Sequence, residues 1–125
     1  METAQEFIKR KNEQFLKDVE KTIPMKDIGR QGKHNFIREA WTFMQQSNME
    51  EKVFVLERLR KVVHMGELAY SNAGLGEIEY RIGYFIIGRI GRAKGKWIWG
   101  QFCPLIPQED LMPLIEKAKQ EKIII

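Results

Sequence analysis

The chain has 125 residues, of which 43% are hydrophobic and 30% charged, a composition that excludes an intrinsically disordered protein. Its length predicts a single domain covering residues 1–125. No apolar run approaches the roughly 18 residues that cross a bilayer, so we expect no membrane partner. The N-terminus is polar, and Cys103 is the only cysteine, so no internal disulfide can form. These features indicate a cytoplasmic protein.

The N-terminal segment predicts a helix. Thr3 and Glu6 fit a capping box, in which each side chain bonds the backbone NH of the other residue. Apolar residues then recur at helical spacing as far as Ile23, and Pro24 is expected to end the helix. The glycine-containing stretch 24–33 predicts a loop.

Two more helices are predicted in the first half of the chain. One covers about residues 34–46, with apolar residues on one side. A second capping-box pattern beginning at Ser47 opens the other, over residues 49–65. That segment is apolar on more than one side, which is typical of the most buried helix of a domain. Residues 66–77 predict a loop.

The pattern changes to a period of two after residue 77. Residues 78–90 alternate and predict a strand covered on both faces near its middle. Residues 91–95 predict a glycine-containing turn, and residues 97–102 a second strand that Pro104 ends. The two strands are expected to form a long antiparallel hairpin.

A last helix is predicted over about residues 108–122, with acidic residues in its first turn and lysines in its last turns. Pro113 could instead occupy the first position of this helix, so the predicted start varies by several residues. The tail 123–125 is a third short strand or a contact with a second copy. The predicted fold class is therefore α+β: three N-terminal helices, a long antiparallel β-hairpin with or without a third short strand, and a C-terminal helix.

The net positive charge of the chain lies in one segment, residues 80–108. This segment holds no acidic residue, whereas outside it 16 basic residues face 17 acidic ones. It also contains two of the three tryptophans. Its five basic residues are Arg81, Arg89, Arg92, Lys94 and Lys96. A basic segment with interleaved aromatic residues is typical of nucleic-acid binding.

A two-residue turn at residues 94–95 would place Arg92 opposite Trp97, and Ile90 opposite Trp99, so that Arg92 and both rings share one face. Arg89 and the lysines would cluster around the tip and contact phosphates, and a tryptophan would stack on a base. The predicted nucleic-acid-binding residues are Arg89, Arg92, Lys94, Lys96, Trp97 and Trp99. In the alternative interpretation both tryptophans pack on the helices, and the charges only solubilise the hairpin.

No cofactor is expected. The pair Gly95–Lys96 invites comparison with a phosphate-binding loop, but Ile90 stands where that motif needs glycine and Trp97 where it needs serine or threonine. A strand also follows, where the motif needs a helix N-terminus.

Metal binding and catalysis have weak support. His34, His64 and Cys103 fit no zinc spacing, and we expect the histidines near a helix start and a helix end. Cys103 is expected to be an inert buried thiol. Glu77 and Glu79 share a strand face, where carboxylates can do acid–base work but are more often a solvated surface. We predict neither catalytic nor metal-ligating residues.

The order helix, helix, helix, hairpin is similar to that of winged-helix domains. That resemblance implies DNA binding, with the third helix entering the groove. The start of the predicted third helix carries Glu50, Glu51 and Glu57, which phosphates would repel. The resemblance is one of element order alone, and it does not establish function.

The sequence therefore predicts a small non-enzymatic domain that binds DNA or RNA through the basic hairpin. One alternative is a protein-interaction or self-association module, in which the tail and the hairpin edge form a homodimer. A second alternative is an enzyme without a recognisable motif.

Overall fold

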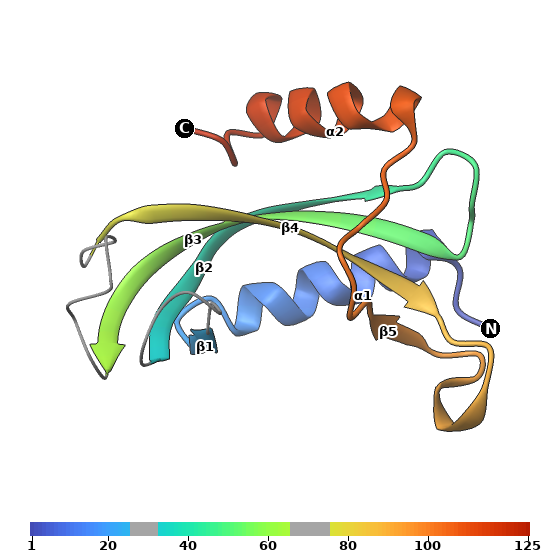
Figure 1. The fold of residues 1–125 in the computed structure, drawn as a ribbon, viewed down its shortest axis with the longest axis horizontal. Coiled ribbons are helices and arrows are strands. Elements are labelled where there is room, and N and C mark those ends of the chain that lie inside the picture. Colours follow the sequence, from blue (N-terminus) through green and yellow to red (C-terminus); the bar gives the residue numbers. More distant parts are fainter. Residues whose placement is uncertain (26–32, 66–75) are drawn as a thin grey trace.

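Two helices lie on opposite faces of a five-stranded antiparallel sheet in the computed structural model of this chain, which describes residues 1–25, 33–65 and 76–125 (Figure 1). The strands are adjacent in sequence order, β1-β2-β3-β4-β5. In chain order the elements are α1 (Ala4–Lys17), β1 (Thr22–Met25), β2 (Lys33–Gln45), β3 (Lys52–Met65), β4 (Ile78–Ile87), a 3-10 turn (Gly91–Ala93), β5 (Trp97–Trp99) and α2 (Gln108–Gln120). No helix among the described residues is long and apolar enough to span a bilayer.

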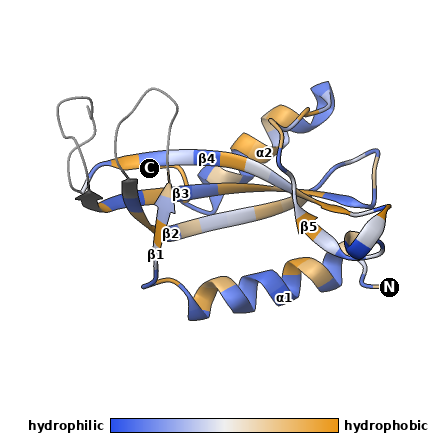
Figure 2. Cartoon of the chain, turned by 60° about the horizontal axis from the view of Figure 1, so that its bottom comes forward, coloured by the Kyte–Doolittle hydropathy of each residue, from blue (hydrophilic) through white to orange (hydrophobic). Residues whose placement is uncertain are grey.

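The prediction of three N-terminal helices is wrong, because residues 33–45 and 52–65 form the strands β2 and β3. These strands lie near the centre of the sheet, with α1 on one face and α2 on the other (Figure 2). Val53 and Val55 face α1, whereas Phe54 and Leu56 face α2, and all four side chains are buried. A strand covered on both faces is apolar throughout, which is also the pattern of a buried helix. The similarity to winged-helix domains disappears with these helices.

A β-bulge explains why β2 resembles a helix. The register between β2 and β3 shifts between Arg38 and Ala40, which inserts one extra residue. Arg38 and Trp41 consequently both face α1, at a spacing of three residues that imitates a helical turn. Strict alternation would have placed them on opposite faces.

The first helix begins as predicted, with the capping box of Thr3 and Glu6 in place. It ends at Lys17 and not at Pro24, which lies in the edge strand β1, where a missing backbone NH is tolerated. The second capping-box pattern is the turn between β2 and β3, in which Gln46 N donates to Lys52 O at 3.0 Å. Most of the two predicted loops falls on residues 26–32 and 66–75, outside the described residues.

The C-terminal region follows the prediction closely. The helix α2 contains Pro113 in its interior, and the acidic residues of its first turn include Asp110. The tail then folds onto the sheet: Ile123 is buried, and the Tyr80 hydroxyl accepts a hydrogen bond from Ile125 N at 3.0 Å. The tail is therefore not a strand: Ile123 covers the core of its own molecule, whereas the Ile125 side chain is 71% exposed.

The predicted hairpin is present as β4 and β5, but it is shorter than expected and has another register. Phe85 pairs with Trp99, and Ile87 with Trp97. The predicted pairing of Ile90 with Trp99 is wrong, because a wide loop replaces the two-residue turn. The hairpin is part of the five-stranded sheet, because β4 pairs with β3 on its other side.

Candidate functional site

The loop between β4 and β5, residues 88–96, is named here the basic loop. It leaves the body of the protein beside the N-terminus, and internal hydrogen bonds fix its shape (Figure 1). Gly88 N donates to Lys96 O, and Gly95 N donates to Gly88 O, both at 2.9 Å. Gly91 and Gly95 have φ angles of +64° and +77°, which side-chain-bearing residues rarely adopt. The loop therefore presents its side chains from a defined backbone.

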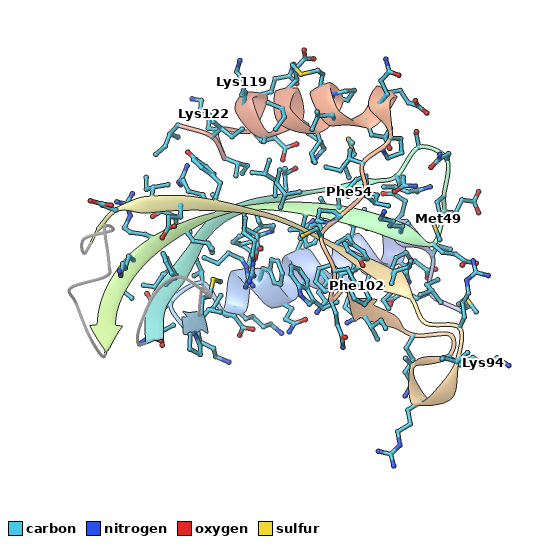
Figure 3. All side chains as sticks on the ribbon, viewed as in Figure 1. Met49, Phe54, Lys94, Phe102, Lys119 and Lys122 are labelled. Atoms are coloured by element: carbon cyan, nitrogen blue, oxygen red, sulfur yellow. The ribbon has the colours of Figure 1, made fainter. Side chains whose placement is uncertain are left out.

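The cations of the basic loop point into solvent. Arg89 is paired with Glu51 at 2.9 Å, and both side chains are largely exposed. Arg92, Lys94 and Lys96 are exposed as well, and in the described part of the chain no carboxylate lies within ion-pair distance of them. Lys94 extends away from the body of the protein (Figure 3). With respect to the described residues, the loop thus carries three uncompensated positive charges.

Trp97 is half-buried and packs against the core. Its ring stacks on Phe7 with centroids 4.7 Å apart, and its Nε1 donates to Glu2 O at 3.0 Å. This tryptophan ties β5 to α1, as the alternative interpretation of the hairpin expected.

Trp99 is different, because 40% of its surface is exposed. Its ring meets Phe85 edge to face with centroids 5.1 Å apart, and the guanidinium of Arg81 lies 4.9 Å from the ring centroid. The ring lies on Gly83, where a side chain would overlap it. The exposed tryptophan thus has an arginine beside it, but that arginine is Arg81 and not Arg92.

Gly83→Ala is expected to displace Trp99 and to destabilise the protein by about 1–3 kcal/mol, the usual cost of overpacking. Urea denaturation and tryptophan fluorescence would measure both effects. The same substitution in a Trp99→Ala background is the control, because the clash is then absent. An equal loss of stability in both backgrounds would contradict the contact.

A buried ion cluster lies beneath Trp99 on the face of the sheet that α1 covers. The Glu57 side chain is 1% exposed, and its carboxylate accepts from Arg38 Nε at 2.5 Å and from Arg81 Nε at 2.7 Å. Arg81 Nη2 adds a second bond to this carboxylate at 3.1 Å. One buried carboxylate therefore holds two guanidinium groups, which come from β2 and β4.

Lys11 brings a third cation from α1 to the same place. Its Nζ lies 5.1 Å from the ring centroid of Phe85 and donates to Gln14 at 3.1 Å. Burial lowers the pKa of Lys11 below its ordinary range, and the charges of Arg10 and Arg38 act in the same direction. The shift therefore reflects chiefly the partial withdrawal of the Lys11 ammonium from water.

No protein-family model matches this chain, and neither curated proteins nor solved structures include a significant match. Functional inference therefore rests on the geometry of the site.

The predicted site residues fall into two groups. The cations of the basic loop lie together at the tip, whereas the two tryptophans lie away from it: Trp97 packs against the core and Trp99 lies beside the ion cluster. The sequence did not single out Lys11 or Arg38, and it marked Glu57 only as an acid that phosphates would repel. The available signal was a carboxylate at the position that continues the buried alternation of Val53 and Val55, which is where Glu57 stands.

The residues considered for metal binding and catalysis do not form a site among the described residues. Cys103 is exposed, in the segment between β5 and α2, so the prediction of a buried thiol is wrong. His34 and His64 are opposite each other in the register of β2 and β3, so neither lies at a helix end, and their side chains lie outside the described residues. Among the described residues no cluster of three metal-ligating side chains occurs. Glu77 and Glu79 do not line the cleft described below.

Proposed function

We propose that this chain is a small cytoplasmic, non-enzymatic domain that binds nucleic acid through the basic loop. The observation that carries the proposal is a set of three exposed cations that have no acidic partner in the described part of the chain, on a backbone fixed by its own hydrogen bonds: Arg92, Lys94 and Lys96. Cations held in this way contact phosphates without a large cost in conformational entropy. Arg89 contributes less, because Glu51 already neutralises it.

Single-stranded DNA or RNA fits this site better than a duplex. Trp99 is three residues beyond the last cation of the loop, on the strand that leaves it, and its ring is partly exposed. At about 3.3 Å per residue along a strand, the ring lies on the order of 10 Å from the loop. Unpaired bases stack on exposed aromatic rings, whereas bases within a duplex do not reach them. In this proposal the loop contacts phosphates and Trp99 stacks on a base.

The combined substitution of Arg92, Lys94 and Lys96 by Gln tests the proposal. We expect it to weaken binding of a fluorescein-labelled single strand by at least about tenfold at low salt, because about three phosphate contacts are lost. Fluorescence anisotropy with single-stranded and duplex DNA and RNA measures the affinities. Unchanged affinity in the loop variant, or no binding by the wild type at tens of micromolar protein, would exclude this function.

The matched control removes the same number of charges elsewhere. Lys9, Lys17 and Lys119 are exposed and lie on α1 and α2, away from the loop. Substituting these three by Gln lowers the net charge equally but leaves the basic loop intact. If the control weakened binding as much as the loop variant, total charge and not the loop would be the cause.

A further inference from the structure

A cleft between α1 and the sheet lies beside the ion cluster and is separate from the basic loop. It has a volume of about 460 Å³, within the range of roughly 300–1,000 Å³ found for small-molecule sites. Apart from the ion pair of Asp18 and Lys21, its lining combines three cations with three aromatic rings: Lys11, Phe15, Arg38, Arg81, Phe85 and Trp99.

The charges of the cleft do not balance. Glu57 neutralises one of the two arginines that it holds, so that among the described residues one guanidinium charge and the charge of Lys11 have no paired carboxylate. At the rim of the cleft Asp18 is paired with Lys21 at 3.1 Å and adds no net charge. Positive charge that is partly withdrawn from water is costly unless an anion accompanies it. The cleft is therefore suited to an anionic ligand.

The guanidinium groups are held in place before any ligand arrives. Arg38 lies 3.7 Å from the ring centroid of Phe15, and Arg81 lies 4.9 Å from that of Trp99. Glu57 engages the Nε of both. Within the described ranges the contact of Arg81 Nη1 is with the sulfur of Met25 at 3.8 Å, so Nη1 can donate to a better acceptor. Fixed arginine side chains bind carboxylates and phosphates with little loss of conformational freedom.

The aromatic walls specify the rest of the ligand. Phe15 and Phe85 are buried, whereas Trp99 exposes 40% of its surface at the mouth of the cleft. Flat rings pack well against such surfaces, in edge-to-face or offset arrangements. An inorganic anion would leave these walls without a contact.

We propose that this cleft binds a small organic anion: a flat ring that carries a carboxylate or a phosphate. The oxyanion lies against Arg38, Arg81 and Lys11, and the ring lies against Phe85 and Trp99. Because Trp99 borders both the cleft and the path of a nucleic-acid strand, the test relies on Lys11 and Arg81, which lie in the cleft alone.

The indole NH groups of the tryptophans provide the measurement. Trp41 Nε1 donates to Asn12, and Trp97 Nε1 donates to Glu2 O, so both are occupied within the protein. Two-dimensional ¹⁵N–¹H NMR of the full chain resolves three indole signals, and Trp99→Phe identifies that of Trp99. The probes are indole-3-carboxylate, adenosine 5′-monophosphate and inorganic phosphate. We expect a ring-bearing anion to shift the Trp99 signal saturably below about 1 mM, and the other two signals much less.

Two variants decide the outcome. Arg81→Gln is expected to raise the dissociation constant at least about tenfold, and Lys11→Gln several-fold, because each loses a charged contact with the oxyanion. Lys11 is on the helix surface, so Lys11→Gln is expected to fold. It therefore provides the test if Arg81→Gln fails to fold. Lys17→Gln, which removes a charge from the same helix outside the cleft, is expected to bind as the wild type does. The combined basic-loop variant is also expected to bind normally.

Three results would overturn the proposal: no shift with either ring-bearing anion at about 10 mM, unchanged binding in Lys11→Gln, or inorganic phosphate binding as tightly as the ring-bearing anions. If indole-3-carboxylate and adenosine 5′-monophosphate differ in affinity, the probe that binds more tightly identifies the preferred oxyanion. A preference for either one supports the site.

Discussion

Glu57→Gln is expected to lower the free energy of unfolding by about 3–5 kcal/mol, because it leaves buried arginine charge without a partner. The Glu57 side chain is 1% exposed, and Arg38 and Arg81 are 13% and 33% exposed. Glutamine has nearly the same shape, so the effect measures the lost charge and not a cavity. Urea denaturation followed by circular dichroism gives the free energy.

The matched control is Glu51→Gln. Glu51 also pairs with an arginine, Arg89, but the two side chains are 43% and 73% exposed. An exposed pair contributes about 1 kcal/mol or less, because water already solvates both charges. A loss of less than about 1 kcal/mol for Glu57→Gln as well would show that water reaches the cluster, and would contradict its buried character.

Phe7→Ala is expected to destabilise the protein by about 3–5 kcal/mol. Phe7 is fully buried and is the residue of α1 with the most ring contacts: its centroid lies 4.7 Å from Trp97, 5.0 Å from Phe85 and 6.4 Å from Phe43. The substitution removes the contact between α1, β4 and β5 at their centre. Thermal and urea denaturation would measure the loss, with altered tryptophan fluorescence as Trp97 loses its stacking partner.

Phe102→Ala serves as its control, because the Phe102 side chain is 80% exposed. The same chemical change there is expected to alter stability by no more than about 0.5 kcal/mol. If both variants lost the same stability, the packing of α1 on the sheet would not be the main source of the effect.

The helices and the hairpin could be predicted because their signals are local. The capping box of Thr3 and Glu6 marks the start of α1, and the charge polarity of residues 108–120 marks α2. The alternation within residues 78–87 marks β4. The hairpin register is less local, because it depends on hydrogen bonds within the basic loop that close a wider connection than two residues.

The strands β2 and β3 could not be predicted in the same way, because what distinguishes them from helices lies elsewhere in the chain. Their apolar residues on both faces are explained by α1 and α2, which cover opposite sides of the sheet. The bulge near Arg38 then gives β2 a spacing of three residues. Tertiary coverage and a one-residue irregularity together overrode the periodic pattern.

The two candidate sites also differ in whether their residues are neighbours in the sequence. The cations of the basic loop are neighbours in sequence, so the charge pattern alone placed them together. Arg38, Glu57 and Arg81 belong to three different strands, and only the pairing of β2 with β3 and of β3 with β4 brings them together. The register places Glu57 opposite Arg81, which no local pattern indicates.

The salt dependence of nucleic-acid binding tests the central claim most directly, since it counts the phosphates that the protein neutralises. For three contacts with a single strand, log K is expected to fall with log salt concentration with a slope of about −2. The variant lacking the positive charges of Arg92, Lys94 and Lys96 should have a slope near zero, whereas the control lacking those of Lys9, Lys17 and Lys119 should keep the wild-type slope. Equal slopes for the wild type and the loop variant would contradict a site on the basic loop.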